Sequence, residues 1–156
     1  CSSDLDANST MRLSFGTVCG YTPFDGAEYD YYTTTKGVLE KVKAHVDDVD
    51  FAVQPEVLSL LSSGNFGRYA DEKGEMKVCF ISNNDITGGN SGSAMLNSKG
   101  ELLGLAFDGN WEAMGSDILY EPKMQRTIGV DVRYILFMIE KYGKAGNLIQ
   151  ELNILN

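Results

Sequence analysis

Residues 86–107 read ITGGNSGSAMLNSKGELLGLAF, a stretch rich in Gly, Asn and Ser followed by two apolar runs. The runs SAML (93–96) and ELLGLAF (101–107) flank NSKG (97–100), and this pattern is typical of a β-hairpin with a tight turn. The apolar run MKVCFIS (76–82) precedes the Gly-rich stretch and predicts another strand. The centre of the chain is therefore expected to consist of strands on either side of an irregular loop.

Further signals of secondary structure lie on both sides of this centre. Alternating polarity, or an excess of aromatic and β-branched residues, predicts strands over 11–21, 29–35 and 126–132. Helical spacing and helix-end residues predict helices over 54–64, 132–143 and 145–155. The segment 37–46 is ambiguous. Many short strands followed by a terminal helix predict a mainly β fold, either a barrel or a sandwich with a helical tail.

Length and composition indicate one globular domain over residues 1–156. The chain is 43% hydrophobic and 22% charged, and it has no apolar run of the roughly 18 residues that a membrane-spanning helix needs. Its formal net charge is −9, and such a surface repels phosphate backbones. We therefore expect no binding to nucleic acid.

The three cysteines indicate neither a disulfide framework nor a metal site. Cys19 and Cys79 stand in strand-like apolar runs, where a buried and inert thiol is the favoured interpretation. Cys1, followed by SSD, fits the first residue of a mature lipoprotein or an arbitrary start of the sequence, and we favour the second. With no initiator Met and no signal peptide, the chain is expected to be a mature or excised piece.

The stretch GNSGS (89–93) has the residues that a nucleophilic serine needs. Such a serine sits on a turn that exposes its hydroxyl and directs backbone N–H groups at a developing oxyanion. The neighbouring glycines allow the unusual backbone conformations of such a turn. By itself, however, a Gly-x-Ser-Gly sequence also fits a plain loop, so this stretch alone leaves both interpretations open.

A family resemblance covers nearly the whole chain. The loop resembles that of chymotrypsin-like peptidases, with Asn90 in place of Asp and Ala94 in place of Pro. The longer stretch NNDITGGNSGSAMLNSKGELLGLAFDGNWEAM is similar to the dipeptidyl-peptidase 7 and 11 family of bacterial serine exopeptidases. The same holds for DANSTMRLSFGTVCGY, YYTTTKGVLEK, FGRYAD, LYEPKMQRTIGVDVRYILFMIEKYG and LIQELNI. The resemblance implies the C-terminal portion of that family, with the dipeptidyl-peptidase 7 type as the nearest, and a chymotrypsin-like C-terminal β-barrel half with short helices and a C-terminal helix.

The resemblance also implies roles for individual residues. Ser91 matches the nucleophile, and the N–H groups of Gly89 and Ser91 match the oxyanion hole. Asp108 matches the residue that receives the free α-amine of the substrate, although read locally it would cap a hairpin turn. Family members that prefer acidic P1 residues have Arg where this chain has Gly109, so a hydrophobic P1 preference is implied. For Trp111 we favour a packed wall over a stacking platform.

No residue of this chain matches the general base of the family. Its only histidine is His45, near Asp47, Asp48 and Asp50, and we favour a solvated surface cluster over a catalytic pair. In the family, the catalytic His and Asp and a helical domain lie upstream of the matched region. The isolated chain is therefore expected to be inactive, because a serine without a base is a poor nucleophile at neutral pH.

Three further features bear on the resemblance. Ala94 stands where the family usually has Pro, and Gly115 and Ser116 stand in the reverse of the order expected for the family. Asn90 cannot form the buried carboxylate–ammonium pair that activates many trypsin-like zymogens.

Three hypotheses follow for function. The first is a parent serine dipeptidyl-peptidase that needs no cofactor or metal and acts on peptides with a free N-terminus. Its partners would be the missing N-terminal barrel and helical domain, with a homodimer as a further assembly, in the periplasm or on the cell surface of a Gram-negative bacterium. The second is a non-catalytic β-domain that binds peptides or partners. The third is a surface protein anchored by lipid at Cys1.

Overall fold

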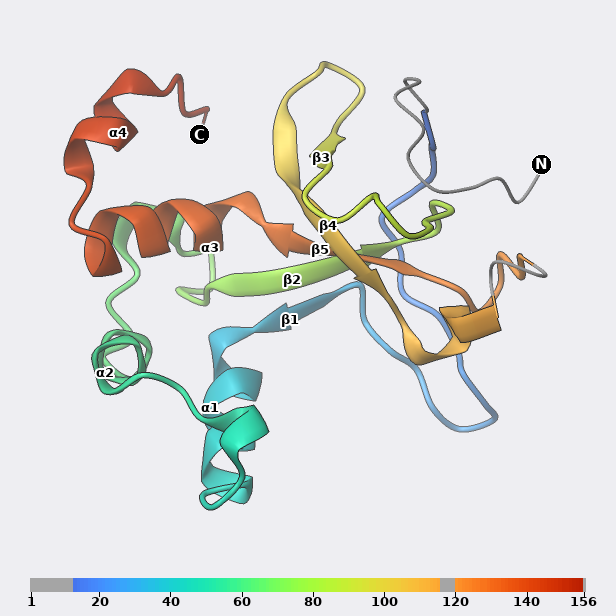
Figure 1. Cartoon of the computed structure of the whole chain (residues 1–156), viewed down its shortest axis with the longest axis horizontal. Helices are drawn as coiled ribbons and strands as arrows, with labels where there is room; N and C mark the ends of the chain where they lie inside the picture. Colours follow the sequence, from blue (N-terminus) through green and yellow to red (C-terminus); the bar gives the residue numbers. More distant parts are fainter. Residues whose placement is uncertain (1–12, 116–119, 156) are drawn as a thin grey trace. The chain divides into compact units, whose positions relative to one another are not determined.

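The computed structural model describes residues 13–115 and 120–155 (Figure 1). The chain divides into two compact units. The sheet unit comprises Cys1–Tyr32 and Cys79–Val132, and the helical unit comprises Thr33–Val78 and Arg133–Asn156. The prediction of one domain over 1–156 stays a prediction.

A five-stranded sheet carries the central hairpin (Figure 1). Its strands are β1 (Tyr32–Thr34), β2 (Lys77–Ser82), β3 (Ala94–Leu96), β4 (Leu102–Gly109) and β5 (Thr127–Asp131). Their order is β1-β2-β5-β4-β3, and β2, β5, β4 and β3 pair antiparallel in succession. The predicted β-sheet with short helices is confirmed. In the described part of the chain β1 and β3 are the two edges, so the strand pairing gives an open sheet and not a closed barrel.

The hairpin predicted over 93–107, with its turn at 97–100, is confirmed. Met95 lies opposite Gly104, and the Asn97 N–H donates to the Glu101 carbonyl at 2.9 Å. The Asn97 side chain closes the turn, because its Oδ1 accepts from the N–H groups of Lys99 and Glu101 at 2.9 and 3.0 Å. This local arrangement explains why the sequence alone was informative here.

The strand predicted over 11–21 is wrong. Residues 11 and 12 lie outside the described part, and residues 13–21 contain only two isolated bridges, Val18 to Ser82 and Tyr21 to Tyr29. The segment is held instead by contacts with Asn83, whose Oδ1 accepts from the Thr17 N–H at 2.6 Å. Alternating polarity shows that a segment could pair, but the available pairing edge is decided by distant residues.

The helical unit contains four α-helices. They are α1 (Thr35–Ala44), α2 (Pro55–Ser62), α3 (Val132–Phe137), which begins at the boundary with the sheet unit, and α4 (Gly146–Glu151), and one π-helical turn, Met138–Tyr142, follows α3. The helices predicted over 54–64 and 132–143 are confirmed, the one predicted over 145–155 is shorter and ends at Glu151, and the ambiguous segment 37–46 is helical as far as Ala44. The strand predicted over 29–35 is shorter than expected, because Thr35 begins α1. No helix in the described part is long and apolar enough to cross a membrane.

The core of the helical unit is aromatic and aliphatic. Its most buried members are Leu61, Phe66, Tyr69, Met76 and Phe137. The Phe137 ring meets the rings of Phe66 and Tyr69 edge-on, with centroids 5.8 and 6.0 Å apart. Edge-to-face contacts of this kind add to the stabilisation from burial.

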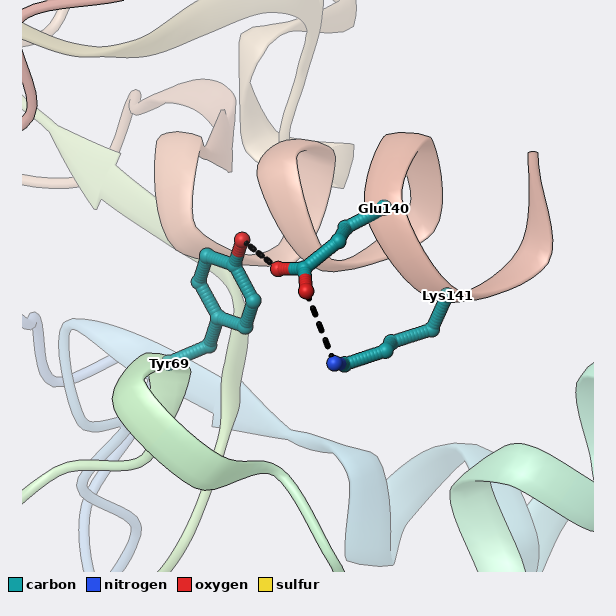
Figure 2. A network of polar contacts seen from close by, with 3 residues as sticks. All are labelled: Tyr69, Glu140 and Lys141. Carbon is teal, nitrogen blue, oxygen red and sulfur yellow. Dashed lines mark hydrogen bonds and ion pairs between the residues drawn. The ribbon is translucent and has the colours of Figure 1, made fainter. Parts of the chain in front are cut away.

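One polar cluster closes this core. Figure 2 shows the Tyr69 hydroxyl donating to Oε2 of Glu140, whose Oε1 lies 2.8 Å from Lys141 Nζ. Burial, together with the hydrogen bond to Glu140, raises the pKa of Tyr69 to about 12. The hydrogen bonds from Lys141 and from Tyr69 lower the pKa of Glu140. The cluster thus joins the π-helical turn to the segment that contains Tyr69.

Candidate functional site

Ser91 lies in the loop between β2 and β3, and its side chain is exposed. On either side of it, Gly89 has φ 91° and Gly92 has φ 85°, the left-handed region that favours glycine. The local sequence therefore produces a sharp turn whose tip carries the serine. A nucleophilic serine requires such an exposed position on a sharp turn.

Hydrogen bonds to β4 fix the C-terminal side of this turn. The Gly92 N–H donates to the Ala106 carbonyl at 2.7 Å, and the Ala106 N–H donates back to the Ser93 carbonyl at 2.9 Å. The Ser91 hydroxyl donates to the Phe107 carbonyl at 3.2 Å. Ser91 is thereby held beside the end of β4.

The two predicted oxyanion donors have no acceptor in the described part of the chain. Neither the N–H of Gly89 nor that of Ser91 donates a hydrogen bond to residues 13–115 or 120–155. Exposed N–H groups on a glycine turn can bind an oxyanion or the carbonyl oxygen of a ligand.

A cleft of about 270 Å³ opens beside Ser91. Its walls are formed by Ile86, Thr87, Gly88, Ser91, Phe107, Asp108, Gly109, Asn110, Ala113 and Met114. Ser91, Asp108 and Gly109, three of the four predicted site residues, therefore line one cleft. The fourth, Gly89, directly follows the wall residue Gly88 in the chain. Apart from Asp108, the lining carries no charged group, so most of the surface suits an uncharged side chain.

The structure gives Gly109 a steric role. A Cβ at this position would lie 2.9 Å from the Cβ of Ala113, on the 3₁₀ turn Trp111–Gly115. Any side chain at position 109 would have to displace that turn. The absence of a side chain at Gly109 therefore allows the turn Trp111–Gly115 to pack closely against the end of β4.

Asp108 is exposed at the cleft, and its Oδ1 accepts the Gly109 N–H at 2.7 Å. This is the local bond that the turn-capping interpretation expects. It leaves the carboxylate at the wall of the cleft, where it can also meet an ammonium group.

Sequence reasoning missed the buried polar group behind this cleft. Asn110 is buried, and its Nδ2 donates to Oε2 of Glu112 and to the Met124 carbonyl, both at 2.8 Å. Its Oδ1 accepts the Arg126 N–H at 2.8 Å. Asn110 therefore joins the wall of the cleft to the segment that enters β5. The letters FDGNW give no signal that this Asn is buried.

Arg126 extends the same network. The side chain is 6% exposed and donates to the carbonyl groups of Pro122, Gln125 and Gly20 at 2.8–2.9 Å. The guanidinium lies 5.3 Å from the ring centroid of Tyr21, whose hydroxyl donates to Glu112 at 2.9 Å. Burial, foremost, raises the pKa of Tyr21. The bond from Arg126 to Gly20 joins positions 106 residues apart, and the bond from Tyr21 to Glu112 joins positions 91 apart, so no local pattern could reveal these two.

Neither His45 nor Trp111 is among the residues that line this cleft. His45 is exposed in the helical unit, its ring stacked on Phe51 at 4.2 Å, whereas Ser91 belongs to the sheet unit and bonds to Phe107. The favoured interpretation of His45 as a solvated residue agrees with this exposure. Trp111 is 82% exposed, so the prediction that it packs as a wall is wrong.

The cysteine predictions have mixed outcomes. Cys19 and Cys79 are only half-buried, less than predicted. Cys1, Ser116 and Asp117 lie outside the described residues. Within the described ranges, no group of three His, Cys, Asp or Glu side chains could hold a metal ion.

Comparison with known proteins places these observations in a family. The sequence profile of the family Peptidase S46 matches residues 3–154. The chain is 59% identical over 149 residues to dipeptidyl-peptidase 7 of Porphyromonas endodontalis and 58% identical over 150 residues to that of Porphyromonas gingivalis. These matches cover 96% of this chain but 18% and 21% of the relatives.

A solved structure of a relative also matches this chain. The crystal structure of Porphyromonas endodontalis DPP11 in complex with the dipeptide Arg-Glu is similar with a TM-score of 0.86 at 43% identity. The match covers 93% of this chain and 20% of that one. The chain therefore spans about a fifth of the length of its relatives.

Proposed function

The chain belongs to the peptidase S46 family, and we propose that it is the portion of a serine dipeptidyl-peptidase that carries the nucleophile. The parent protein would release dipeptides from the N-termini of peptides. The observation that carries the proposal is the exposed Ser91 on a glycine turn, beside a cleft walled by Asp108 and Gly109. The dipeptidyl-peptidase names of its relatives support it.

The reaction follows from the groups at the cleft. The Ser91 Oγ attacks the carbonyl carbon of the second residue of the substrate and gives its proton to a base. The N–H groups of Gly89 and Ser91 stabilise the oxyanion. The C–N bond then breaks and the leaving amine takes the proton from the base. Water hydrolyses the resulting ester, which frees the dipeptide and restores the Ser91 hydroxyl.

Two further positions, Asp108 and Gly109, recognise the α-amine and the P1 side chain of the substrate in this proposal. Asp108 pairs with the free α-amine, which limits the enzyme to peptide N-termini. The P1 side chain enters the cleft, where Ile86, Phe107, Ala113 and Met114 offer apolar contacts and position 109 adds no charge. We therefore propose a hydrophobic P1 preference. The higher identity to dipeptidyl-peptidase 7 (59%) than to the Asp/Glu-specific enzyme of Porphyromonas gingivalis (46%) supports it.

The rest of the parent protein completes the site in this proposal. The open sheet forms the C-terminal half of a chymotrypsin-like pair of barrels, and the N-terminal barrel supplies the His and Asp of the triad. A helical domain encloses the amino end of the peptide. The isolated chain is then inactive, and the parent works in the periplasm or at the cell surface of a Gram-negative bacterium, with a homodimer as its candidate assembly.

Labelling of the serine tests the proposal directly. A phosphonate probe is incubated with the full-length parent and with residues 1–156 alone, each with Ser91→Ala as control, and intact mass is measured. We expect one added probe on the parent and none on its Ser91→Ala variant or on the isolated chain. Labelling of the isolated chain would contradict the missing-base proposal. A parent that is neither labelled nor active would instead indicate a non-catalytic binding domain.

Turnover then tests the substrate class. Dipeptide amides with Leu or Phe at P1 are compared with those that have Asp or Glu. We expect kcat/KM for the apolar set to exceed that for the acidic set by at least about tenfold, the discrimination that one well-matched apolar side chain supplies. Equal values would contradict the proposed preference.

A further inference from the structure

Asn90 forms a reciprocal pair with Thr87. The Thr87 N–H donates to Oδ1 of Asn90 at 3.0 Å, and the Asn90 N–H donates to the Thr87 carbonyl at 3.2 Å. The two bonds close a ring around Gly88 and Gly89. Gly89 is one of the two predicted oxyanion donors, so the ring encloses a part of the proposed catalytic apparatus.

Asn90 contacts a different hollow from Ser91. It lines a groove of about 620 Å³ in the sheet unit, together with the extended residues Leu13–Gly16 and strand β3. The lining of the 270 Å³ cleft includes Ser91 but not Asn90. Asn90 therefore contacts the groove and not the cleft, and it does not belong to the wall that a substrate would touch.

Hydrogen bonds restrain the loop on both sides of Ser91, whose own hydroxyl donates to the Phe107 carbonyl. On the C-terminal side, Gly92 and Ser93 bond to Ala106 on β4. On the N-terminal side, the restraint is the Thr87–Asn90 ring. Two consecutive glycines lose more conformational freedom on ordering than any other pair of residues, so this side needs a specific restraint.

We propose that Asn90 is a positioning residue, whose amide oxygen holds the Gly88–Gly89 turn in the conformation that presents the oxyanion donors. This inference rests on the proposed function, because it assigns a role to the geometry of the same loop. An oxyanion hole works only when its donors are preorganised, and removal of one donor slows catalysis about 10²–10³-fold. Loosening the turn without removing a donor is expected to slow it less.

The hydrogen bonds make a distinction between two substitutions. Oδ1 of Asn90 accepts a hydrogen bond, whereas its Nδ2 donates none to the described residues. Asn90→Asp keeps an acceptor at this place, and Asn90→Leu keeps the size but removes the acceptor. A matched control exists in Asn97→Leu, because the Oδ1 of Asn97 also accepts backbone N–H groups, in the hairpin turn.

The experiment measures kcat and KM in the full-length parent for these three variants. We expect Asn90→Leu to lower kcat about ten- to hundredfold and to change KM less than about threefold, since the cleft keeps its contacts. Asn90→Asp should stay within about fivefold of the parent, and Asn97→Leu should leave kcat unchanged while it lowers stability. Equal kcat for Asn90→Leu and Asn97→Leu would overturn the inference. So would an Asn90→Asp variant as slow as Asn90→Leu, because the acceptor would then be irrelevant.

A second measurement does not depend on the folding of a variant. Hydrogen exchange of the Thr87 amide in the full-length parent is read by fragmentation mass spectrometry. Protection of at least about tenfold over an unstructured amide is expected, and exchange at the unstructured rate would show that the ring does not persist. Failure of the proposed function has another signature, namely a parent without turnover or a Ser91→Ala variant that keeps it.

Discussion

The Ser91 turn in the sheet unit and the Tyr69 cluster in the helical unit differ in how far their polar groups are satisfied. In the helical unit, the buried Tyr69 hydroxyl bonds to Glu140, which is paired in turn with Lys141, so the cluster is complete within itself. In the sheet unit, the turn at Ser91 leaves the N–H groups of Gly89 and Ser91 without a partner in the described part of the chain. A complete cluster contributes to stability, whereas free donors on a fixed turn are available to a ligand.

The difference between the units also explains why the same kind of residue has two uses. Gly89 and Gly74 both have positive φ, 91° and 79°. Gly74 closes a turn in which its N–H donates to the Asp71 carbonyl at 2.9 Å. Gly89 adopts a similar conformation, but its N–H has no such bond. The comparison predicts that equal strain at the two positions has unequal effects on activity.

The largest expected effect comes from Gly89→Ala. A side chain in the left-handed region costs about 1–2 kcal/mol, so the turn is expected to relax and move its N–H groups. We expect kcat/KM of the full-length parent to fall about 10²–10³-fold, as on loss of an oxyanion donor. Gly74→Ala is the control, with a comparable loss of stability and an unchanged kcat/KM. Similar losses of activity in both variants would show that the two units do not differ in this way.

A smaller effect is expected when the buried network behind the cleft is cut. Asn110→Ala removes three hydrogen bonds and leaves Glu112 and the Arg126 N–H short of a partner. The free energy of unfolding should fall by about 2–4 kcal/mol, since each unsatisfied buried group costs about 1–3 kcal/mol. Urea denaturation measures it, with Asn97→Ala in the half-buried hairpin turn as a control that should lose about 1 kcal/mol or less. Equal losses of unfolding free energy in Asn110→Ala and Asn97→Ala would mean that the buried hydrogen bonds of Asn110 stabilise the cleft wall no more than a hairpin turn is stabilised by its Asn.

How far the sequence alone could predict these features depends on the range of the contacts. The hairpin around Asn97 and the helix from Pro55 form through neighbouring residues, and both were predicted in the right place. The segment 13–21 was wrongly predicted as a strand, because its partners are near Asn83, which no local pattern identifies.

The candidate site shows the same limit. The Gly-x-Ser-Gly letters predicted a sharp turn at Ser91, which the φ angles of Gly89 and Gly92 confirm. The roles of Asp108 and Gly109 are predicted from the family resemblance, and in the structure both residues line the same cleft as Ser91. The network from Asn110 to Arg126 remained hidden, because buried polar bonds between distant segments leave no periodic signal.

In the helical unit, Tyr69→Phe isolates the contribution of one hydrogen bond. The variant keeps the ring contact with Phe137 but leaves Glu140 with Lys141 alone. We expect the free energy of unfolding at pH 7 to fall by about 1–2 kcal/mol. Tyr142→Phe, which removes a hydroxyl bonded to Gln54 on a 40% exposed residue, should change it by about 0.5 kcal/mol or less. Activity of the full-length parent should be unaffected by either, and a loss of turnover in Tyr69→Phe would break the division of roles between the units.

The smallest expected effect is the pH dependence of that same bond. The pKa of Tyr69 is raised to about 12 from a usual value near 10, so the folded state favours the protonated hydroxyl. Its contribution to stability is complete below pH 10 and is lost as the pH rises toward 12. The Glu140 pKa is lowered, so its contribution is present above the usual carboxyl range and is lost as the pH falls through that range. Urea denaturation of wild type and Tyr69→Phe at pH 7 and pH 11 should show the difference between them shrinking by about 1 kcal/mol. A difference that stays constant would mean that Tyr69 ionises as easily in the folded chain as in the unfolded one, and that the hydroxyl is not held by Glu140.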